Sequence, residues 1–169
     1  MATTDSTPIV IRPATSADVP VLGRLAASLV RLHHDFDPQR FIAASPETER
    51  RYGAFLGSQL AAPNVVVFVA DRGGAVLGYT YAGVEDYDYM ALRGPAGALY
   101  DIVVEPAHRG QGVGALLLEA TLAALAARGV PRVVLSTATQ NAAAQRLFTR
   151  AGFRATMIEM TREVRSDAR

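Results

Sequence analysis

Residues 104–114 read Val-Glu-Pro-Ala-His-Arg-Gly-Gln-Gly-Val-Gly, and they join an apolar strand to a helix rich in alanine and leucine. Glycines in such a turn adopt backbone conformations that other residues resist, and they let a ligand approach the main-chain amides closely. The following helix, predicted from Gly112 to Arg128, begins with N–H groups that lack partners within the helix, and the positive end of its dipole lies there. The stretch therefore predicts an anion site, with a phosphate as the natural ligand.

Two common phosphate-binding motifs do not fit this turn. The chain contains no lysine, which excludes a Walker-type loop, because that loop needs a lysine after its last glycine. A dinucleotide fingerprint requires the spacing G-x-G-x-x-G near the start of a strand–turn–helix unit and an acidic residue about 20 residues further on. Here the spacing is G-x-G-x-G, it occurs late in the chain, and the next strand ends in Ser136 and Thr137.

The pattern Arg109-x-x-Gly112-x-Gly114 resembles the R-x-x-G-x-G signature of the GCN5-related N-acetyltransferases, the GNAT family. Two further stretches support the resemblance, in the expected order. Residues 99–106, Leu-Tyr-Asp-Ile-Val-Val-Glu-Pro, resemble the fourth strand of the family, and residues 141–153 resemble its second conserved helix and final turn. The likeness covers residues 8 to 163. One departure is Phe148, where family members commonly carry tyrosine.

Length and composition are typical of one compact domain, predicted over residues 8–163 with loose termini at 1–7 and 164–169. A net charge of +1 with 20% charged residues provides no basic face, so we expect no nucleic-acid partner. The absence of cysteine excludes disulfides, thiolate metal sites and a cysteine nucleophile. Neither a membrane-spanning run nor a signal pattern is evident, so we expect a soluble, cytoplasmic protein without a membrane partner.

Hydrophobic periodicity and turn signals predict alternating elements. Because the middle strands have hairpin-like connections and one strand–helix–strand step requires a parallel crossover, the expected fold class is α/β with a mixed, mostly antiparallel twisted sheet flanked by helices. The family resemblance adds a splayed parallel pair. The expected elements are a strand at Ile9–Arg12, a helix from N-cap Ser16 through Leu32, a helix from Ser45-Pro46 to Leu60, strands Val65–Asp71 and Ala75–Val84, a loop Glu85–Gly97, the strand before the glycine turn, the helix Gly112–Arg128, a strand Arg132–Ala138, a helix Asn141–Ala151 and a last strand or hairpin arm Phe153–Glu163.

The resemblance also implies which residues bind acetyl-CoA, the expected co-substrate. The glycine turn would hold the pyrophosphate, and the main chain of the strand before it would hold the pantetheine arm and direct one N–H at the thioester carbonyl. Asn141 would contact the pantetheine or a nearby backbone group, although an asparagine that opens a helix is equally an N-cap. The expected cofactor-binding residues are Ile102, Val103, Val104, Arg109, Gly110, Gln111, Gly112, Val113, Gly114, Asn141 and Phe148.

An amine substrate is mostly protonated near neutral pH, so the reaction needs a base. In the resembled family an acidic residue on the strand before the glycine turn, or on its neighbour, often accepts that proton, so Asp101 and Glu85 are the expected catalytic bases. An unpaired carboxylate on the apolar strand of Asp101 would be costly without a reason. A structural hydrogen bond is the alternative for Asp101, and a solvated rim charge is the alternative for Glu85. In the resembled family a tyrosine at the position of Phe148 often protonates the departing thiolate. Phe148 has no hydroxyl, so Tyr100 is the third catalytic candidate. Tyr81 or solvent are the other sources of that proton.

The expected acceptor is a primary amine of a small molecule, attacked directly in a ternary complex since no cysteine is present. A peptide or protein amine, and a catalytically silent acyl-CoA sensor, are the alternatives. The acidic, tyrosine-bearing residues 85–89 suit a cationic amine or the rim of a homodimer. The adjacent His33 and His34 lack a fixed ligand geometry, so no metal is expected. We expect them instead to belong to a loop that lines the acceptor cleft or an interface.

Overall fold

The protein is described here by a computed structural model covering residues 7–164. Most of the predicted loose termini, 1–7 and 164–169, lie outside the described residues. In chain order the elements are β1 (Val10–Pro13), the short helix η1 (Ser16–Asp18), α1 (Val19–Phe36), α2 (Thr48–Gln59), β2 (Val65–Arg72), β3 (Ala75–Glu85), β4 (Ala96–Val104), the short helix η2 (Pro106–His108), α3 (Val113–Ala126), β5 (Val133–Leu135) and α4 (Ala142–Arg150).

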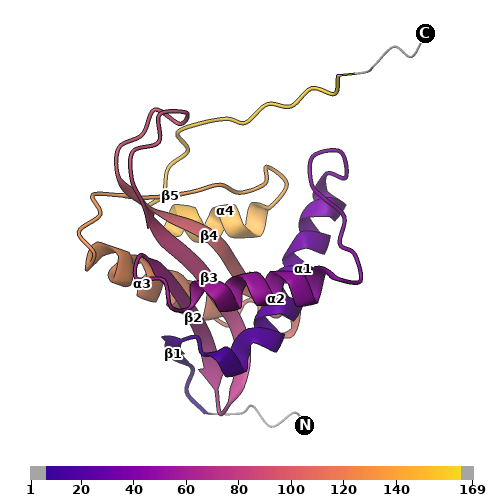
Figure 1. The fold of residues 1–169 in the computed structure, drawn as a ribbon, viewed down its shortest axis with the longest axis vertical. Helices are drawn as coiled ribbons and strands as arrows, with labels where there is room; N and C mark the ends of the chain where they lie inside the picture. Colours follow the sequence, from indigo (N-terminus) through magenta and orange to yellow (C-terminus); the bar gives the residue numbers. More distant parts are fainter. Residues whose placement is uncertain (1–6, 165–169) are drawn as a thin grey trace.

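The strands form one sheet in the order β1-β2-β3-β4-β5, with antiparallel pairs from β1 to β4 and a parallel pair β4–β5 (Figure 1). The turn at Arg72-Gly73-Gly74 closes the β2–β3 hairpin as its sequence predicts, with both glycines at positive φ. The crossover from β4 to β5 runs through α3, because parallel neighbours need a long connection. The predicted mixed sheet flanked by helices is confirmed.

Helices cover both faces of this sheet. On one face, Leu22 and Leu25 of α1 and Leu56 of α2 pack against Val69 and Tyr79 of the sheet. On the other face, α3 and α4 contribute the buried side chains Leu118, Leu125 and Phe148, which pack on strands β2 to β4. Within residues 7–164, no helix is long and apolar enough to cross a bilayer.

Strands β4 and β5 stay together for three residue pairs only, the last being Leu99 with Leu135. Next to that point β4 contains an irregularity, since Leu99 pairs with Ala82 and Asp101 with Tyr81, which leaves Tyr100 without a partner on β3. A bulge of this kind bends a strand and is common beside active sites. Residues 100–104 therefore have no neighbour on the β5 side, and the predicted splayed pair is observed.

Three predicted details are wrong. Ser16 is not an N-cap: the chain first makes the short helix η1, capped by a reciprocal pair of hydrogen bonds between Thr15 and Asp18, and α1 follows. The helix expected from Ser45-Pro46 begins at Thr48, because Ser45 and Thr48 first bond each other in a turn. The last strand is absent: residues 153–164 pair with no other strand of the described chain.

Candidate active site

The glycine turn has an open surface. Gly110 and Gly112 have φ angles of 75° and 83°, and a Cβ atom added to either would meet no atom within 4 Å. Gly112 is the N-cap of α3 and receives no side-chain cap. Among residues 7–164, the amides of residues 110–114 donate to no backbone or side-chain acceptor. Unpaired donors at a helix N-terminus, with free space in front of them, are the structural requirements of an anion site.

Two long side chains beside the turn bond to the backbone around it. Nε of Arg109 donates to the carbonyl of Val104 at 3.1 Å, and Nε2 of Gln111 donates to the carbonyl of Ala107 at 3.2 Å. The bond to Val104 leaves the two terminal nitrogens of the Arg109 guanidinium free of any other partner in the described chain. The guanidinium thus adds a positive charge beside the open amides.

The backbone of β4 presents polar groups to the gap between the splayed strands. Before the bulge, the N–H of Gly97 faces the β5 side, since it donates to the carbonyl of Arg132 at 2.9 Å. After the bulge the carbonyl of Val104 faces that side, because it accepts from Arg109. Successive residues of a strand alternate, so Ile102 has the same orientation as Val104. The bulge therefore points the N–H of Ile102 into the gap.

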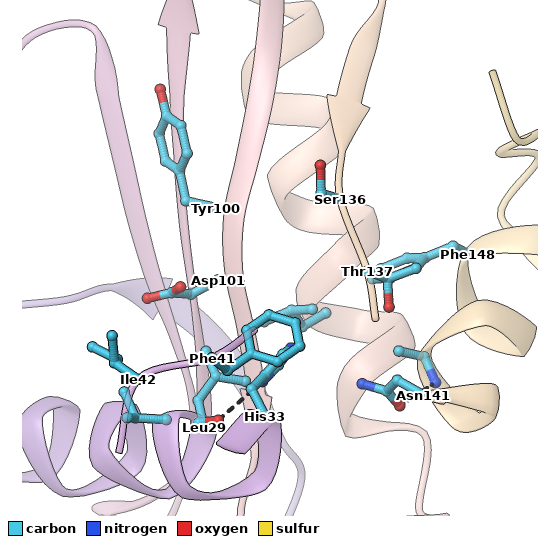
Figure 2. Close-up of a pocket in the computed structure, with 13 residues that line it drawn as sticks. Leu29, His33, Phe41, Ile42, Tyr100, Asp101, Ser136, Thr137, Asn141 and Phe148 are labelled. Atoms are coloured by element: carbon cyan, nitrogen blue, oxygen red, sulfur yellow. Dashed lines mark hydrogen bonds between the residues drawn. The ribbon is translucent and has the colours of Figure 1, made fainter. Parts of the chain in front are cut away.

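A cavity of about 260 Å³ opens in this gap (Figure 2). Strand β4 contributes three consecutive lining residues at and after the bulge, and the chain that follows β5 contributes two hydroxyls. Helices α1 and α4 and the loop after α1 close the remaining sides. The lining residues are Leu29, Val30, His33, Phe41, Ile42, Tyr100, Asp101, Ile102, Ser136, Thr137, Asn141, Ala144 and Phe148.

Asp101 is the buried charge of this cavity, with 6% of its surface exposed. Tyr52 of α2 donates to its Oδ2 at 2.9 Å and Tyr79 of β3 donates to the same oxygen at 2.9 Å. Burial raises the pKa of the Asp101 carboxyl, while the bonds from Tyr79 and Tyr52 and the charge of His33 oppose the rise. A carboxylate with a raised pKa is a stronger base than an ordinary carboxylate.

Tyr100 and Glu85 form a second polar group at the cavity edge. The hydroxyl of Tyr100 donates to Oε1 of Glu85 at 2.7 Å, and Arg93 forms an ion pair with the other oxygen of Glu85. Burial, followed by the bond to Glu85, raises the pKa of Tyr100, so its hydroxyl keeps its proton at neutral pH. Tyr100 lines the cavity, whereas Glu85 and Tyr81 do not.

Helix α4 supplies the predicted Asn141 and Phe148. Oδ1 of Asn141 accepts from the amide of Ala144 at 3.1 Å, so Asn141 is an N-cap, and it also lines the cavity. Phe148 is 6% exposed, and its ring packs edge-on against Phe153 with centroids 5.9 Å apart. Asn141 and Phe148, which the sequence predicts to bind acetyl-CoA, thus face the gap from the α4 side (Figure 2).

The two histidines bond backbone carbonyls. Nδ1 of His33 lies 2.9 Å from the carbonyl of Leu29, and Nδ1 of His34 lies 2.9 Å from the carbonyl of Phe41. A carbonyl can only accept, so both Nδ1 atoms carry hydrogen. His33 lines the cavity and His34 does not. The described part of the chain contains no group of three potential metal ligands among His, Asp and Glu side chains.

Tyr52 and Tyr79, the two donors to Asp101, are site residues that sequence reasoning missed. Tyr79 lies in a buried stretch of β3 and Tyr52 lies on an ordinary amphipathic helix, so each has the pattern of a core residue. Tyr52 and Tyr79 lie 49 and 22 residues before Asp101 in the sequence, so no local motif links them to it. The sequence offered one signal. Burying the carboxylate of Asp101 costs free energy unless hydrogen-bond donors elsewhere in the fold bond to it.

Comparisons with known proteins identify relatives in sequence and in fold. A mycothiol acetyltransferase of Thermobispora bispora is 38% identical over 86 residues, which are 51% of this chain and 29% of that relative. A mutant BH1408 protein of Bacillus halodurans superimposes with a TM-score of 0.79 at 20% identity, covering 92% of this chain and 99% of the other. The aminoglycoside N-acetyltransferase AAC(6')-Iy in complex with CoA gives a TM-score of 0.72 at 19% identity, covering 97% and 99%.

These solved structures establish the fold, and the curated relative is matched over less than a third of its length. The family model described as the acetyltransferase (GNAT) family matches residues 29–153, which include the bulged strand, the glycine turn and α4. That range is most of the chain, and it carries the resemblance predicted from the R-x-x-G-x-G pattern. The chain belongs to the GNAT acetyltransferase family.

Proposed function

We propose that this protein transfers an acetyl group from acetyl-CoA to a primary amine of a small molecule, by direct attack in a ternary complex. The observation that carries the proposal is the continuity of three features. Open amides at the glycine turn, the outward N–H of Ile102 and the buried carboxylate of Asp101 follow one another along β4 and into α3. The open amides would bind the pyrophosphate of acetyl-CoA, the N–H of Ile102 would contact the acyl group, and Asp101 would act as the base.

The glycine turn suits the pyrophosphate of CoA. Free amides, empty space over Gly110 and Gly112 and the Arg109 guanidinium fit a diphosphate, which is anionic and rich in acceptors. Ile102 and Val104 are the strand residues whose outward backbone would hold the pantetheine arm; Val103 lies between them. Gln111, Val113 and Gly114 complete the turn, and Asn141 and Phe148 face the arm from α4. Acetyl-CoA supplies the activated acetyl group.

The Ile102 N–H is the proposed donor to the thioester carbonyl. A backbone donor held on a strand needs no reorganisation as negative charge develops on that oxygen, and such a donor contributes a few kcal/mol to catalysis. Asp101 is the proposed general base. It lies one residue away, and its raised pKa suits removal of a proton from an ammonium group.

Tyr100 is the proposed source of the proton for the departing thiolate. Its hydroxyl is protonated at neutral pH and its ring lines the cavity, whereas Tyr81 does not reach the lining. Glu85 acts through Tyr100 in this scheme, because it accepts the Tyr100 hydrogen bond and is itself neutralised by Arg93. Solvent is the alternative donor, since a thiol with a pKa of about 8.5 leaves tolerably as a thiolate.

The acceptor is proposed to enter from the α1 side of the cavity. His33, Phe41 and Ile42 form that side, so it combines apolar contacts with the carboxylate of Asp101. The names of two similar proteins, a mycothiol acetyltransferase and an aminoglycoside N-acetyltransferase, favour a small molecule over a peptide. A cytoplasmic location and a homodimer complete the proposal.

An acyl-CoA sensor without turnover is the second candidate, and Phe148 favours it because this position lacks the hydroxyl that relatives commonly have. Incubation with acetyl-CoA and a panel of amines, with free thiol followed by a chromogenic thiol reagent, separates the two. The chain contains no cysteine, so all thiol signal comes from CoA. We expect release that depends on an amine. Acetyl-CoA binding without release on any acceptor would favour the sensor, and absence of acetyl-CoA binding would refute both.

A further inference from the structure

We propose that the acceptor is an arylalkylamine, an amine joined to an aromatic ring by a chain of two or three carbons, and that its ring rests on the side chains of Phe55, Tyr81 and Tyr100. We call these three side chains the aromatic shelf. The proposal rests on the proposed function, because it names the acceptor class of that same site. It gives the ring of the acceptor a place beside the carboxylate of Asp101, where the amine reacts.

The aromatic shelf is a continuous row of rings that runs from α2 across two strands. The ring of Phe55 on α2 meets the ring of Tyr81 on β3 edge to face, with centroids 5.8 Å apart. The ring of Tyr81 lies 4.8 Å from that of Tyr100 on β4. Tyr81 packs on the same core cluster as α1 and α2, so the shelf belongs to that face of the sheet. The row meets the cavity at Tyr100, which lines it.

The shelf is accessible to a ligand. Phe55 is 46% exposed and Tyr100 is 44% exposed, and Tyr81 between them is partly buried. Single exposed apolar side chains are ordinary, but adjoining ones are typical of a binding surface. Because these rings adjoin one another beside the cavity, the shelf extends the apolar lining of the cavity toward α2.

The ring of Tyr100 is held in place from two sides. A Cβ atom at Gly83 would come within 3.3 Å of both Cε2 and the hydroxyl oxygen of Tyr100, so the ring lies directly over this glycine. At its far end the hydroxyl donates to Oε1 of Glu85 at 2.7 Å. A side chain that is already fixed loses little conformational entropy when a ligand binds to it. The shelf is therefore preorganised.

The shelf borders Asp101. Tyr81 is paired with Asp101 in the register of β3 and β4, and directly opposite residues of two strands share one face. Tyr52 donates to Asp101 at 2.9 Å, and its ring lies 6.1 Å from that of Phe55. Tyr100 and Asp101 lie on the same side of the cavity (Figure 2). Neighbouring strands are about 4.8 Å apart, and a chain of two or three carbons spans a separation of that size.

The charges around the shelf favour one ammonium group and an uncharged ring. Asp101 forms no ion pair within residues 7–164, so an ammonium group would be its counter-ion. Glu85, beside the shelf, already accepts from Tyr100 and from Arg93. Burial raises the pKa of Tyr81 and of Tyr100, so both hydroxyls stay neutral. A second ammonium group on the shelf would find Glu85 engaged and the charge of Arg93 nearby, whereas an aromatic ring needs no counter-ion.

The geometry of the shelf suits an aromatic ring better than an aliphatic one. Aromatic pairs prefer edge-to-face or offset contacts with centroids about 4.5 to 7 Å apart, and such pairs are stabilised beyond the area that they bury. The shelf rings already contact one another in this way. A ligand ring can extend the same row over the exposed parts of Phe55 and Tyr100.

With its ring on the shelf, the acceptor presents its amine to Asp101. Asp101 takes one proton from the ammonium group, and the free amine forms a bond to the carbonyl carbon of the thioester. The bond from that carbon to sulfur then breaks. The second proton lost by the nitrogen leaves with CoA as its thiol, and the product is the N-acetylated arylalkylamine.

The first test compares kcat/KM for thiol release with three amines. 2-Phenylethylamine and 2-cyclohexylethylamine have similar size, but only the first has an aromatic ring, and 1,4-diaminobutane carries a second charge. We expect 2-phenylethylamine to exceed 2-cyclohexylethylamine by about three- to tenfold. Phe55→Leu should bring that ratio close to one, and Phe55→Tyr, which keeps the ring, should preserve it. A ratio that Phe55→Leu leaves unchanged, or a preference for the diamine, would overturn the shelf but not acetyl transfer to amines.

The second test measures binding without turnover. Isothermal titration of 2-phenylethylamine into the protein saturated with CoA should show binding that is weakened about three- to tenfold by Phe55→Leu. Binding of this kind without thiol release from any amine would support the shelf and refute the proposed transfer. Absence of binding, or equal binding of 2-cyclohexylethylamine, would overturn the shelf.

Tyr89→Leu tests the neighbouring β3–β4 loop, where Tyr89 is 77% exposed and its ring is stacked on that of Tyr87. A preference for the aromatic amine that is lost in Tyr89→Leu and kept in Phe55→Leu would place the ring on the loop and overturn the proposal. Phe55 is half exposed, so its replacement should leave the fold intact, and circular dichroism of each variant checks this.

Discussion

The hydroxyl of Tyr79 donates to Oδ2 of Asp101 at 2.9 Å, and both side chains are buried within the sheet. Tyr52 donates to the same carboxylate from α2. Neither donor carries a charge, and no cation pairs with Asp101 in the described chain. The ionisation of Asp101 therefore depends on a balance between burial, which disfavours the charged form, and the two neutral donors together with nearby His33, which favour it.

Removing one donor should shift that balance. Tyr79→Phe raises the pKa of Asp101 further, because the bond from Tyr79 lowers it. A hydrogen bond to a charged group is worth about 1.5 to 3 kcal/mol, or about one to two pH units. The acidic limb of the pH profile of kcat should therefore move to higher pH by about one to two units. Tyr81→Phe, on the same strand without a bond to Asp101, is the control. Superimposable limbs for Tyr79→Phe and the natural enzyme would contradict the assignment.

Asp101→Asn should lower kcat by about 10²- to 10⁴-fold, because it removes the proposed base. The amide can still accept the tyrosine bonds, so the fold and the KM for acetyl-CoA should change little. The exposed Asp86 in the β3–β4 loop offers a matched control, and Asp86→Asn should keep nearly full activity. If both variants retained turnover, the base would have to be sought elsewhere.

The stability of two threonine variants should reveal the direction of the buried hydrogen bond between Thr80 and Thr121. Thr121 donates to the carbonyl of Leu117 at 2.8 Å, so the 2.7 Å bond between Thr80 and Thr121 must have Thr80 as its donor. Thr121→Val leaves the Thr80 hydroxyl buried without a partner, at a cost of about 1 to 3 kcal/mol. Thr80→Val keeps the bond from Thr121 to Leu117 and should cost less. Urea unfolding of both variants measures the difference, and the opposite order would show that the bond runs the other way.

Stability should depend on pH through Asp18. The hydrogen bond from Arg12 lowers the pKa of Asp18 from 3.8 to about 2. A carboxyl with a depressed pKa stabilises the fold above its ordinary pKa, and that contribution disappears as pH falls from about 4 to about 2. The shift corresponds to about 2 kcal/mol. The difference in unfolding free energy between the natural chain and Asp18→Asn should therefore shrink from pH 6 to pH 2. A constant difference would exclude this linkage.

Local patterns predicted the elements whose structure depends on their own residues. The Gly73-Gly74 turn and the N-cap of α3 at Gly112 required positive φ angles, which glycine supplies at no steric cost. Two apolar segments joined at the glycine turn placed β2 and β3 within one residue of their observed ends. The R-x-x-G-x-G pattern located the open amides of the glycine turn for the same reason.

Features that depend on a distant partner could not be predicted. The apolar residues near Ile158 have the composition of a strand, but a strand needs a neighbour, and composition does not say which edge is free. The bulge at Tyr100 depends on the register between β3 and β4, which neither strand contains alone. The tyrosines that bond Asp101 come from elements remote in the sequence, so only the assembled fold brings them together.

Binding of acetyl-CoA to a pair of glycine variants tests the central claim most directly. Gly112 and Gly129 bracket α3 with φ angles of 83° and 76°, and both have open space at the Cβ position. Gly112→Asp and Gly129→Asp therefore impose similar backbone strain and the same charge, but only Gly112 lies in the proposed pyrophosphate site. Isothermal titration should show that Gly112→Asp abolishes acetyl-CoA binding while Gly129→Asp retains it. Equal affinities for the two variants, or no binding by the natural chain, would contradict the account.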